Sequence, residues 1–513
     1  MADLTRLHKD NDDATREYEA ALIAGSYSSP PPNTEASPYL RRVRNASRNA
    51  AKNNFVMRKY LNTVVDATVG TGIQLESRLM MQPRSRVRQV EPNQRLNDQI
   101  EDAWHNWSEQ CDIRGQMNLY EVQRFLVHTL ARDGEGLVHY GITSDGNVAL
   151  ELIEPELLDV DYNTPEAKDG SLFALGVKLN SVGRPIGYAI LGRNPEELRQ
   201  VRANVPYHLF FTSDQILHIY KKEYSDQLRG FPWAHASLVL MNHLKEYEHN
   251  LLVKARIHAS ITYFLKTQSP DLGSKFGRSQ VTDSEKGHSR DVVTSIPGSV
   301  QKLPPGTEID TPKLSGVDLN HEVYLRQTMQ LAAGGVGLSY ESMSGDYSKS
   351  NFSSSRLARL QEQSTFRSIQ QMVVDKFLRP IFNVWIQNEV QTGRIRLSRN
   401  QLQQLISSRR AARWILPGFV SVDPEKTTRA DILALEAGLK SRTEILASEG
   451  KDFTNLVKQI QQERDLLYEA GLDDLAEPNP TNDTPAEDAA ATEEEETEET
   501  PVEEEDEDAV SEE

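Results

Sequence analysis

The sequence has a single cysteine, no long apolar run and no compact nucleotide-binding motif. Cys111 alone cannot form an intramolecular disulfide framework or a cysteine-rich metal site, which favours a reducing compartment. No apolar segment approaches the roughly 20 residues that a membrane helix needs, and the N-terminal stretch lacks the apolar core of a signal peptide. We therefore expect a soluble, intracellular protein, and 513 residues suggest two to four structural modules.

Motifs for common enzyme chemistry are also missing. The chain has no GxxxxGK[ST] phosphate loop, so it should not hydrolyse ATP. It has no HExxH, and His243 and His249 lie six residues apart, which places them on different faces of a helix. Asp133 and Glu135 could be imagined as an acid/base pair, but Asp-Gly before a strand is more typical of a turn. We predict that the protein is not an enzyme and binds no cofactor or metal.

Negative charge is concentrated at the C-terminus. The net charge is −19, and residues 481–513 hold 17 Asp or Glu and no Lys or Arg, so the remaining 480 residues carry about −2. A tail of this composition cannot bury enough apolar surface to offset the entropy of ordering, and we expect disorder. It either solvates the protein or docks on a specific partner, and composition alone does not choose between these.

A basic segment follows the proline-containing stretch YSSPPPNTEASPY, which is typical of a flexible arm. The segment is predicted to form one helix that ends near Gly70 and Gly72. We interpret its cations as a solvated or intersubunit face in preference to a DNA-phosphate contact. They are Arg41, Arg42, Arg44, Arg48, Lys52, Arg58 and Lys59.

The middle of the chain has the pattern of an α+β body. Ser144–Asn147 separates two alternating apolar runs and predicts a hairpin, and Gly183 with Pro185 predicts a second one. Residues 231–266 form the longest helical pattern, with Pro232 in the first turn and a length of roughly 50 Å. A second helix through NHEVYLRQTMQLAAG leads into a polar segment.

That polar segment is GVGLSYESMSGDYSKSNFSSSRLARLQEQ, residues 335–363. Gly345, Asp346 and Asn351 favour turns, and 353–355 supplies three serines as N-cap candidates before a new helical spacing. The segment is therefore predicted to be a loop between two helices.

Seven motifs in order give the chain a family resemblance. It resembles the lambda-type portal proteins of tailed phages from about residue 40 to 475. The motifs are ARDGEG (131–136), LELIEPELL (150–158), GVKLNSVGRPIGYAI (176–190), RGFPW (229–233), KLPPGTEI (302–309), GLSYESMSGDYSKSNFSSSRLARL (337–360) and the C-terminal pattern that contains Asp423-Pro424, Gly438-Leu439-Lys440-Ser441 and Gly450-Lys451-Asp452.

The resemblance implies an α+β portal-type ring subunit with long stem helices, small antiparallel sheets in the wing and clip, and a helical crown. Such subunits form a ring, usually of twelve copies, at one capsid vertex of the virion, after assembly in the host bacterial cytoplasm. The ring is the channel for DNA packaging and ejection. The implied partners are other copies of the chain, double-stranded DNA, the terminase large subunit, a major capsid or scaffold protein and neck or head–tail adaptor proteins, with no membrane.

The resemblance also implies a division of the chain. The expected parts are a flexible N-terminal arm (1–40), wing (41–230), stem helix (231–268), clip (269–316), second stem helix (317–342), tunnel loop (343–355), returning wing helix (356–399), crown (400–475) and disordered acidic tail (476–513). The arm and the acidic tail have no clear counterpart in the family.

Two sets of site residues follow from this division. The tunnel loop would project into the channel, where small polar side chains allow DNA to slide and Lys349 supplies a ring of like charge. Its residues are Gly345, Asp346, Tyr347, Ser348, Lys349, Ser350 and Asn351. Leu240, Leu244 and Leu251 would pack between neighbouring stem helices.

Three alternatives remain at this point. The loop could be an ordinary surface loop. The protein could be a homo-oligomeric minor capsid or scaffold component that never contacts DNA, or an enzyme whose site is too irregular for motif analysis. A closed ring with an axial hole wide enough for duplex DNA distinguishes the portal hypothesis from the others.

Overall fold

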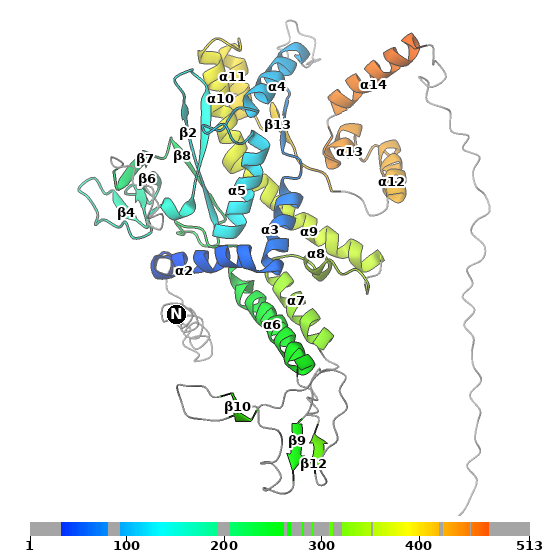
Figure 1. Cartoon of the computed structure of the whole chain (residues 1–513). Coiled ribbons are helices and arrows are strands. Elements are labelled where there is room, and N and C mark those ends of the chain that lie inside the picture. The colour runs from blue at the N-terminus through cyan, green and yellow to red at the C-terminus, as the bar shows by residue number, and fades with distance from the viewer. Residues whose placement is uncertain are drawn as a thin grey trace, which may run out of the picture. The chain divides into compact units, whose positions relative to one another are not determined.

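The computed structural model describes residues 32–80, 93–192, 206–260, 264–267, 280–281, 290–291, 307–310, 321–349, 352–419, 424–451 and 453–470 (Figure 1). The chain divides into two compact units, Met1–Asp452 and Phe453–Glu513. The acidic tail 476–513, residues 1–31 of the expected arm, most of the expected clip, Ser350 and Asn351 lie outside the described residues.

Helices make up most of the described first unit. They are α2 (Pro32–Asn53), α3 (Phe55–Thr68), α4 (Gln94–Ser108), α5 (Leu119–Asp133), α6 (Leu238–Ser260), α7 (His321–Gly335), α8 (Tyr340–Ser344), α9 (Phe352–Val373), α10 (Arg379–Gln391), α11 (Arg399–Ser407), α12 (Pro424–Glu436) and α13 (Arg442–Ser448). A π-helical turn, Val374–Leu378, joins α9 to α10, and short 3-10 turns occur at Pro155–Leu157 and His235–Ser237. The second unit contains α14 (Phe453–Glu469).

All paired strands are antiparallel and form small sheets. The strands are β1 (Gln74–Ser77), β2 (Glu135–Ile142), β3 (Val148–Ile153), β4 (Leu172–Ala174), β5 (Val177–Leu179), β6 (Pro185–Leu191), β7 (His208–Thr212), β8 (Ile216–Tyr220), β9 (Phe264–Thr267), β10 (Gln280–Val281), β11 (Arg290–Asp291), β12 (Thr307–Asp310) and β13 (Ala412–Ile415). Their orders are β3-β2-β8 and β4-β5-β6-β7, with the pairs β1-β13, β10-β11 and β9-β12. The expected mixture of helices and small antiparallel sheets is confirmed.

Both predicted hairpins are present. Gly146 has φ +76° in the turn between β2 and β3, a conformation that glycine adopts without steric cost. In the β5–β6 turn the side-chain oxygen of Asn180 accepts hydrogen bonds from the backbone N–H groups of Val182 and Arg184 at 3.1 and 2.8 Å. Local turn chemistry therefore fixes the register of these strands.

The main core forms where helices that are distant in sequence meet. Trp104 of α4 lies 4.7 Å from Trp107 and 5.0 Å from Trp385 of α10, measured between ring centroids. Trp385 is completely buried. The burial of large aromatic rings is a major stabilising term, and this cluster ties α4 to the long α9–α10 segment.

The N-terminal helices differ from the sequence prediction. Helix α2 begins at Pro32, inside the segment 1–40 that was expected to be a flexible arm, and Leu40 is fully buried. The single basic helix is two helices, because the backbone of Asn54 is extended. The Asn54 side chain accepts hydrogen bonds from the N–H groups of Val56 and Met57, so it acts as an N-cap that starts α3.

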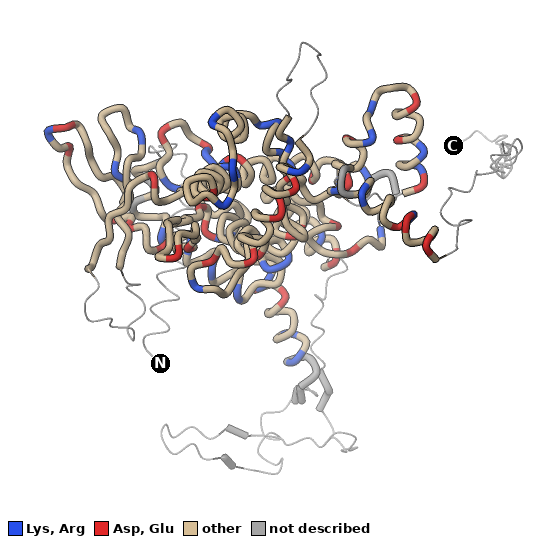
Figure 2. The backbone as a smooth tube through the Cα atoms, turned by 90° about the horizontal axis from the view of Figure 1, so that it is seen from above, with Lys and Arg blue, Asp and Glu red and all other residues tan. Residues whose placement is uncertain are grey.

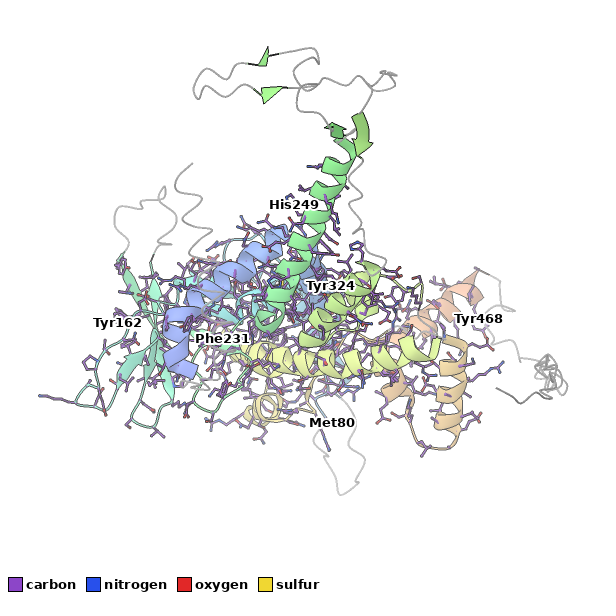
Figure 3. The ribbon with its side chains drawn as sticks, turned by 90° about the horizontal axis from the view of Figure 1, so that it is seen from below. Met80, Tyr162, Phe231, His249, Tyr324 and Tyr468 are labelled. Atoms are coloured by element: carbon purple, nitrogen blue, oxygen red, sulfur yellow. The ribbon has the colours of Figure 1, made fainter. Side chains whose placement is uncertain are left out.

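The two long helices of the expected stem are shorter than predicted. Helix α6 starts at Leu238 rather than near Pro232, and its 23 residues extend about 35 Å. Helix α7 ends at Gly335, and α8 follows as a separate short helix. Helices α6 and α7 lie side by side in Figures 1 and 3, and the Nδ1 atom of His321 lies 3.2 Å from the hydroxyl of Tyr247.

The expected crown, 400–475, is not one structural element. Helix α11 and strand β13 belong to the main core, where Leu405 and Trp414 are buried and β13 pairs with β1. Helices α12 and α13 contain no buried residue, and α14 lies in the second unit. The strand pairing, which joins segments more than 300 residues apart, could not be read from local sequence.

Candidate functional site in the loop between α7 and α9

The predicted tunnel loop is anchored at its base by a buried carboxylate. Glu362 of α9 is only 8% exposed, and it accepts hydrogen bonds from the Ser339 N–H at 2.6 Å and the Ser342 hydroxyl at 2.9 Å. The Ser339 hydroxyl in turn accepts a bond from the Ser342 N–H and caps α8. Hydrogen bonds to an ionised group are roughly twice as strong as neutral ones, so α9 fixes the position of α8.

The tip of the loop is ordered by Asp346. One carboxylate oxygen of Asp346 accepts from the Ser348 N–H at 3.0 Å and from the Ser348 hydroxyl at 2.6 Å. The other accepts from the Tyr340 hydroxyl at 3.2 Å. Gly345 has φ +75° and closes α8 in the left-handed conformation. The bonds from Ser348 lower the pKa of Asp346, so its carboxylate stays charged at neutral pH.

Lys349 forms an ion pair at the end of the described loop. Its ammonium group contacts Glu322 in the first turn of α7, and the two side chains are 56% and 72% exposed. The hydrogen bond from Lys349 lowers the pKa of Glu322. The sequence prediction considered only the positive charge of Lys349, whereas the structure adds two carboxylates, Glu322 and Asp346. The loop is polar and carries little net charge.

The structure brings five of the seven predicted loop residues together, from Gly345 to Lys349. The loop is shorter than the predicted 343–355, because α8 continues to Ser344 and α9 already begins at Phe352. Its position relative to a channel remains a prediction. The contacts of Glu362 were not predicted, because Glu362 lies 20 to 23 positions along the chain from the serines that it binds.

The predicted stem interface is only partly available to a neighbour. Leu244 is 1% exposed within a single chain, so its burial requires no second subunit. Leu240 and Leu251 are partly buried, and the role of all three in an interface stays a prediction. Leu252, which was not considered, is a large apolar side chain of α6 that is 60% exposed.

A buried ionic cluster surrounds Glu135 at the start of β2. Its carboxylate lies 2.7 Å from Arg44, 2.6 Å from Arg229 and 3.0 Å from His218, and it accepts a hydrogen bond from the Gly230 N–H at 2.9 Å. Burial alone raises the pKa of Glu135, but the charged neighbours outweigh it and hold the pKa well below its usual value. We name these residues the Glu135 cluster.

Two motifs behind the family resemblance meet at this cluster. A Cβ on Gly134 of ARDGEG would lie 2.1 Å from the backbone of Phe231 in RGFPW, so the two segments pack backbone to backbone. Gly134 has φ +89° and ends α5, which confirms the turn interpretation of Asp-Gly. Both oxygens of Glu135 are occupied by structural partners. The geometry therefore assigns this acidic pair a folding role.

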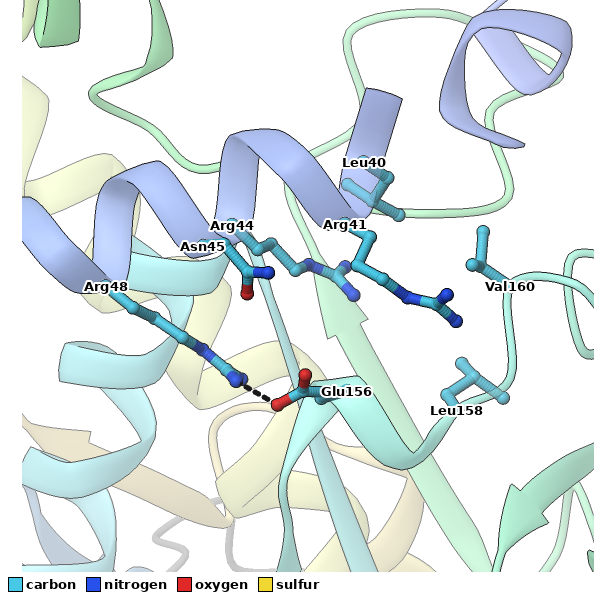
Figure 4. Close-up of a pocket in the computed structure, with 8 residues that line it drawn as sticks. All are labelled: Leu40, Arg41, Arg44, Asn45, Arg48, Glu156, Leu158 and Val160. Atoms are coloured by element: carbon cyan, nitrogen blue, oxygen red, sulfur yellow. Dashed lines mark hydrogen bonds and ion pairs between the residues drawn. The ribbon is translucent and has the colours of Figure 1, made fainter. Parts of the chain in front are cut away.

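The basic helix contributes buried cations to the same region. Arg44 is 5% exposed, and Arg48 bonds to Asp133 at 2.8 Å and also pairs with Glu156 (Figure 4). The prediction of a solvated or intersubunit face is wrong for these two arginines, whereas Arg42 and Lys52 are exposed. Leu40 and Arg44 lie four residues apart and therefore on the same face of α2, and both are buried.

Two other kinds of site are absent from the described part of the chain. No group of three or more His, Cys, Asp or Glu side chains there could hold a metal ion. Within the same residues, no helix combines the length and apolar character needed to cross a membrane.

Comparisons with known proteins identify relatives of the chain. The family model described as "Phage portal protein, lambda family" matches residues 25–370. The probable portal protein of Halomonas phage phiHAP-1 is 25% identical over 385 residues, which cover 74% of this chain and 72% of that protein. Portal protein B of Escherichia phage lambda is 22% identical over 400 residues, covering 73% and 74%.

Among solved structures, a chain in the neck of a native gene transfer agent particle covers 84% of this chain and 98% of its own length. Its sequence identity is 12% and its TM-score is 0.41.

Proposed function

From its membership of the lambda family of phage portal proteins, we propose that the chain assembles into a twelve-subunit ring at the capsid vertex of the virion. The ring is the channel through which a terminase packages double-stranded DNA and through which the genome later leaves. It also docks neck or head–tail adaptor proteins and contacts the capsid or scaffold protein. Assembly takes place in the host bacterial cytoplasm. The match of the family model over residues 25–370 is the observation that carries this proposal.

The arrangement of helices supports a stem in this ring. Strand β9 follows α6 along the chain, and β12 precedes α7. These two strands pair with each other, so the chain runs out along α6 and returns along α7. We assign α6 and α7 to the stem and the segment between them to the clip, where terminase and neck proteins dock. Helices α12 to α14 belong to the crown.

The loop from Gly345 to Lys349 suits a channel lining for a physical reason. Its tip is held by short-range hydrogen bonds to Asp346 and its base by Glu362, so it does not need DNA to become ordered. Its exposed charges form one ion pair and one isolated carboxylate. Such a surface offers a sliding polyanion only weak, screened contacts, which permits movement without strong binding.

Particle images of the purified protein test the ring directly. We expect closed rings with an axial hole wide enough for duplex DNA. Closed particles without such a hole would instead support a minor capsid or scaffold component. Labelling at residue 349 should then place the loop on the channel wall, and a label on the outer wall would contradict the assignment.

A charge reversal tests the loop in a packaging assay. Lys349→Glu places a third negative group beside Glu322 and Asp346, so packaging or DNA retention should fall, most clearly at low salt. Lys451→Glu is a matched control because Lys451 is 62% exposed and pairs with Glu449 at 3.1 Å. Rings should form with both variants. Equal packaging by both would show that the loop does not approach DNA.

A further inference from the structure

Cations are spread over the described body, and Figure 2 shows Lys and Arg positions interspersed with Asp and Glu along the backbone. Charge alone therefore does not single out a residue that binds an anion. Among the described residues, two arginines have a further feature, because Arg326 lies over the ring of Tyr340 and Arg367 over that of Phe419. Arg326 belongs to α7 and Tyr340 to α8, so the first pair lies at the loop of the candidate site.

Arg326 is held beside the loop by Tyr340. The Cζ atom of Arg326 lies 5.1 Å from the centroid of the Tyr340 ring, within the range of a cation–π contact. The Tyr340 hydroxyl donates a hydrogen bond to Asp346 at 3.2 Å, so the same side chain contacts the tip of the loop. The bonds from Ser348 lower the pKa of Asp346, and the positive charge of Arg326 adds a smaller contribution. The guanidinium is therefore close to the loop tip.

The two cations of the site differ in their partners. Lys349 makes an ion pair with Glu322. Arg326 is partly buried, and no carboxylate in the described part of the chain makes an ion pair with it. A guanidinium has five N–H donors, and stacking on a ring uses its face and leaves these donors at its edge. Arg326 can therefore bind an oxyanion without first breaking an ion pair, whereas Lys349 must leave Glu322.

The ligand that suits this arrangement is a backbone phosphate of duplex DNA. A planar guanidinium binds a phosphate through two parallel N–H···O bonds, and such charge-assisted bonds are roughly twice as strong as neutral ones. Because Tyr340 already holds the guanidinium plane, little side-chain entropy is lost on binding. The nearby Asp346 carboxylate stays charged and repels a phosphate, so each contact remains weak enough for the duplex to move on.

We propose that Arg326, oriented by Tyr340, is the residue of the loop site that binds a phosphate of the packaged duplex, and that Lys349 has a minor role there. In a ring, each subunit contributes one such arginine to the channel wall at the level of the loop. The inference rests on the proposed function and deepens it, because it names the residue and the chemical group that meet.

Binding of a short labelled duplex to the purified full-length protein tests this residue. Arg326→Gln should weaken duplex binding about tenfold or more and make it less sensitive to salt. Arg326→Lys keeps the charge but cannot form the bidentate contact, so its affinity should lie between those of the parent and Arg326→Gln. Lys349→Ala should bind almost as tightly as the parent. Equal affinity of Arg326→Gln and the parent would overturn the proposal.

Two variants of Tyr340 test its positioning role. Tyr340→Phe keeps the ring beneath Arg326 and removes only the hydroxyl that bonds to Asp346, so duplex binding should match the parent. Tyr340→Leu removes the ring and should weaken binding toward the affinity of Arg326→Gln. If both variants lose affinity equally, the hydroxyl and not the ring is required, and the assigned role of Tyr340 is wrong.

Arg367→Gln is the matched control. The Cζ atom of Arg367 lies 5.8 Å from the centroid of the Phe419 ring, so the variant removes the same kind of stacked cation. Arg367 lies roughly 22 Å along α9 from the first residue of that helix, away from the loop. Duplex binding should not change. Equal losses for Arg367→Gln and Arg326→Gln would show that the duplex responds only to net charge, which would overturn the assignment.

A packaging assay separates this inference from the proposed function. We expect both Lys349→Glu and Arg326→Gln to lower packaging. If Lys349→Glu lowers packaging and Arg326→Gln does not, the loop approaches DNA without a contact from Arg326, and this inference alone fails. Closed particles of the parent protein without an axial hole would overturn the proposed function, and this inference with it.

Discussion

The Glu135 cluster and the Lys349–Glu322 pair use the same chemistry in opposite surroundings. In the first, the side chains of Glu135 and Arg229 are completely buried, and in the second both partners are more than half exposed. The cluster joins residues up to 186 positions apart, whereas Lys349 and Glu322 are 27 positions apart. The two sites differ in the free-energy cost of separating a charge from its partner.

A buried charge without a partner is costly because it has already lost its hydration, so the Glu135 cluster admits a single arrangement of α2, β2 and the RGFPW segment. An exposed charge without a partner returns to water. The Lys349–Glu322 pair can therefore open and close at little cost, which is suitable for a loop past which a ligand slides. Burial determines whether an ion pair fixes a structure or merely biases it.

Glu135→Ala should have the largest effect on stability. It leaves Arg44, Arg229 and His218 buried without their anion, and removal of one partner from a buried pair costs about 3–5 kcal/mol. Chemical unfolding measures the change, and Glu135→Gln serves if the alanine variant does not fold. Glu151→Ala, which breaks a partly exposed pair with Arg114, should cost below about 1 kcal/mol. Similar costs for both would remove the distinction between buried and exposed pairs.

Glu362→Ala should have an intermediate effect that is local to the loop. It removes the acceptor for the Ser339 N–H and the Ser342 hydroxyl, and each such bond to a carboxylate contributes about 1.5–3 kcal/mol. Hydrogen exchange should become faster in residues 338–349 while the Glu135 cluster stays protected. Gln361→Ala, at the exposed neighbouring position, is the control. Unchanged exchange would mean that α8 is held by other contacts.

The pH dependence of stability also distinguishes buried from exposed groups. Burial lowers the pKa of His218, and the nearby Arg229 and Arg44 add to this, although Glu135 opposes it. The unfolded chain binds a proton below about pH 6.5 that the folded chain does not, so stability should fall on acidification, by at most about 1.4 kcal/mol per pH unit for this group. His218→Gln should flatten the dependence between pH 6.5 and 4.5, whereas His105→Gln, an exposed site, should leave it unchanged.

Below about pH 4.5, protonation of the Glu135 carboxylate contributes to the pH dependence of stability. The pKa of Glu135 lies well below its ordinary value, so its contribution to stability is present above about pH 4.5 and is lost as the pH falls toward the folded-state pKa. A urea midpoint that stays constant from pH 7 to pH 4.5 in the parent protein would contradict the His218 assignment, and one that stays constant as the pH falls further below 4.5 would contradict the Glu135 assignment.

Lys349→Ala should have the smallest effect. Both members of its pair are exposed to water and salt, so thermal unfolding and ring formation should match the parent protein. A marked loss of stability would show that the pair is shielded in the assembled ring, and the loop would then resemble the Glu135 cluster.

Much of the local structure could be predicted from the residues themselves. The Ser144–Asn147 turn and the Gly183 turn were correct, because the geometry of a hairpin depends on two to four neighbouring residues. The start of α6 was wrong. Pro232 is compatible with a first helical turn, but the Trp233 N–H bonds to the Ala131 carbonyl at 3.2 Å and holds the segment outside the helix.

In the candidate site, too, the local turn could be predicted and the long-range contacts could not. A polar turn at Gly345–Lys349 was predictable, since Gly, Asp and Ser favour turns wherever they occur together. The anchor at Glu362 and the pairing of Lys349 with Glu322 were not, because each joins residues 20 to 27 positions apart whose approach depends on how α7, α8 and α9 pack.

The lack of a phosphate loop, the nearly neutral body with its acidic tail, the two hairpins and the polar loop between helices all follow from the residues. These features depend on composition or on close neighbours. Which charges are buried follows instead from the packing of the elements. Arg44 and Arg42 are two residues apart in one helix, yet Arg44 is enclosed with Glu135 and Arg42 faces water. Charge burial depends on the elements that pack against a helix, and these come from segments about 90 to 190 residues away.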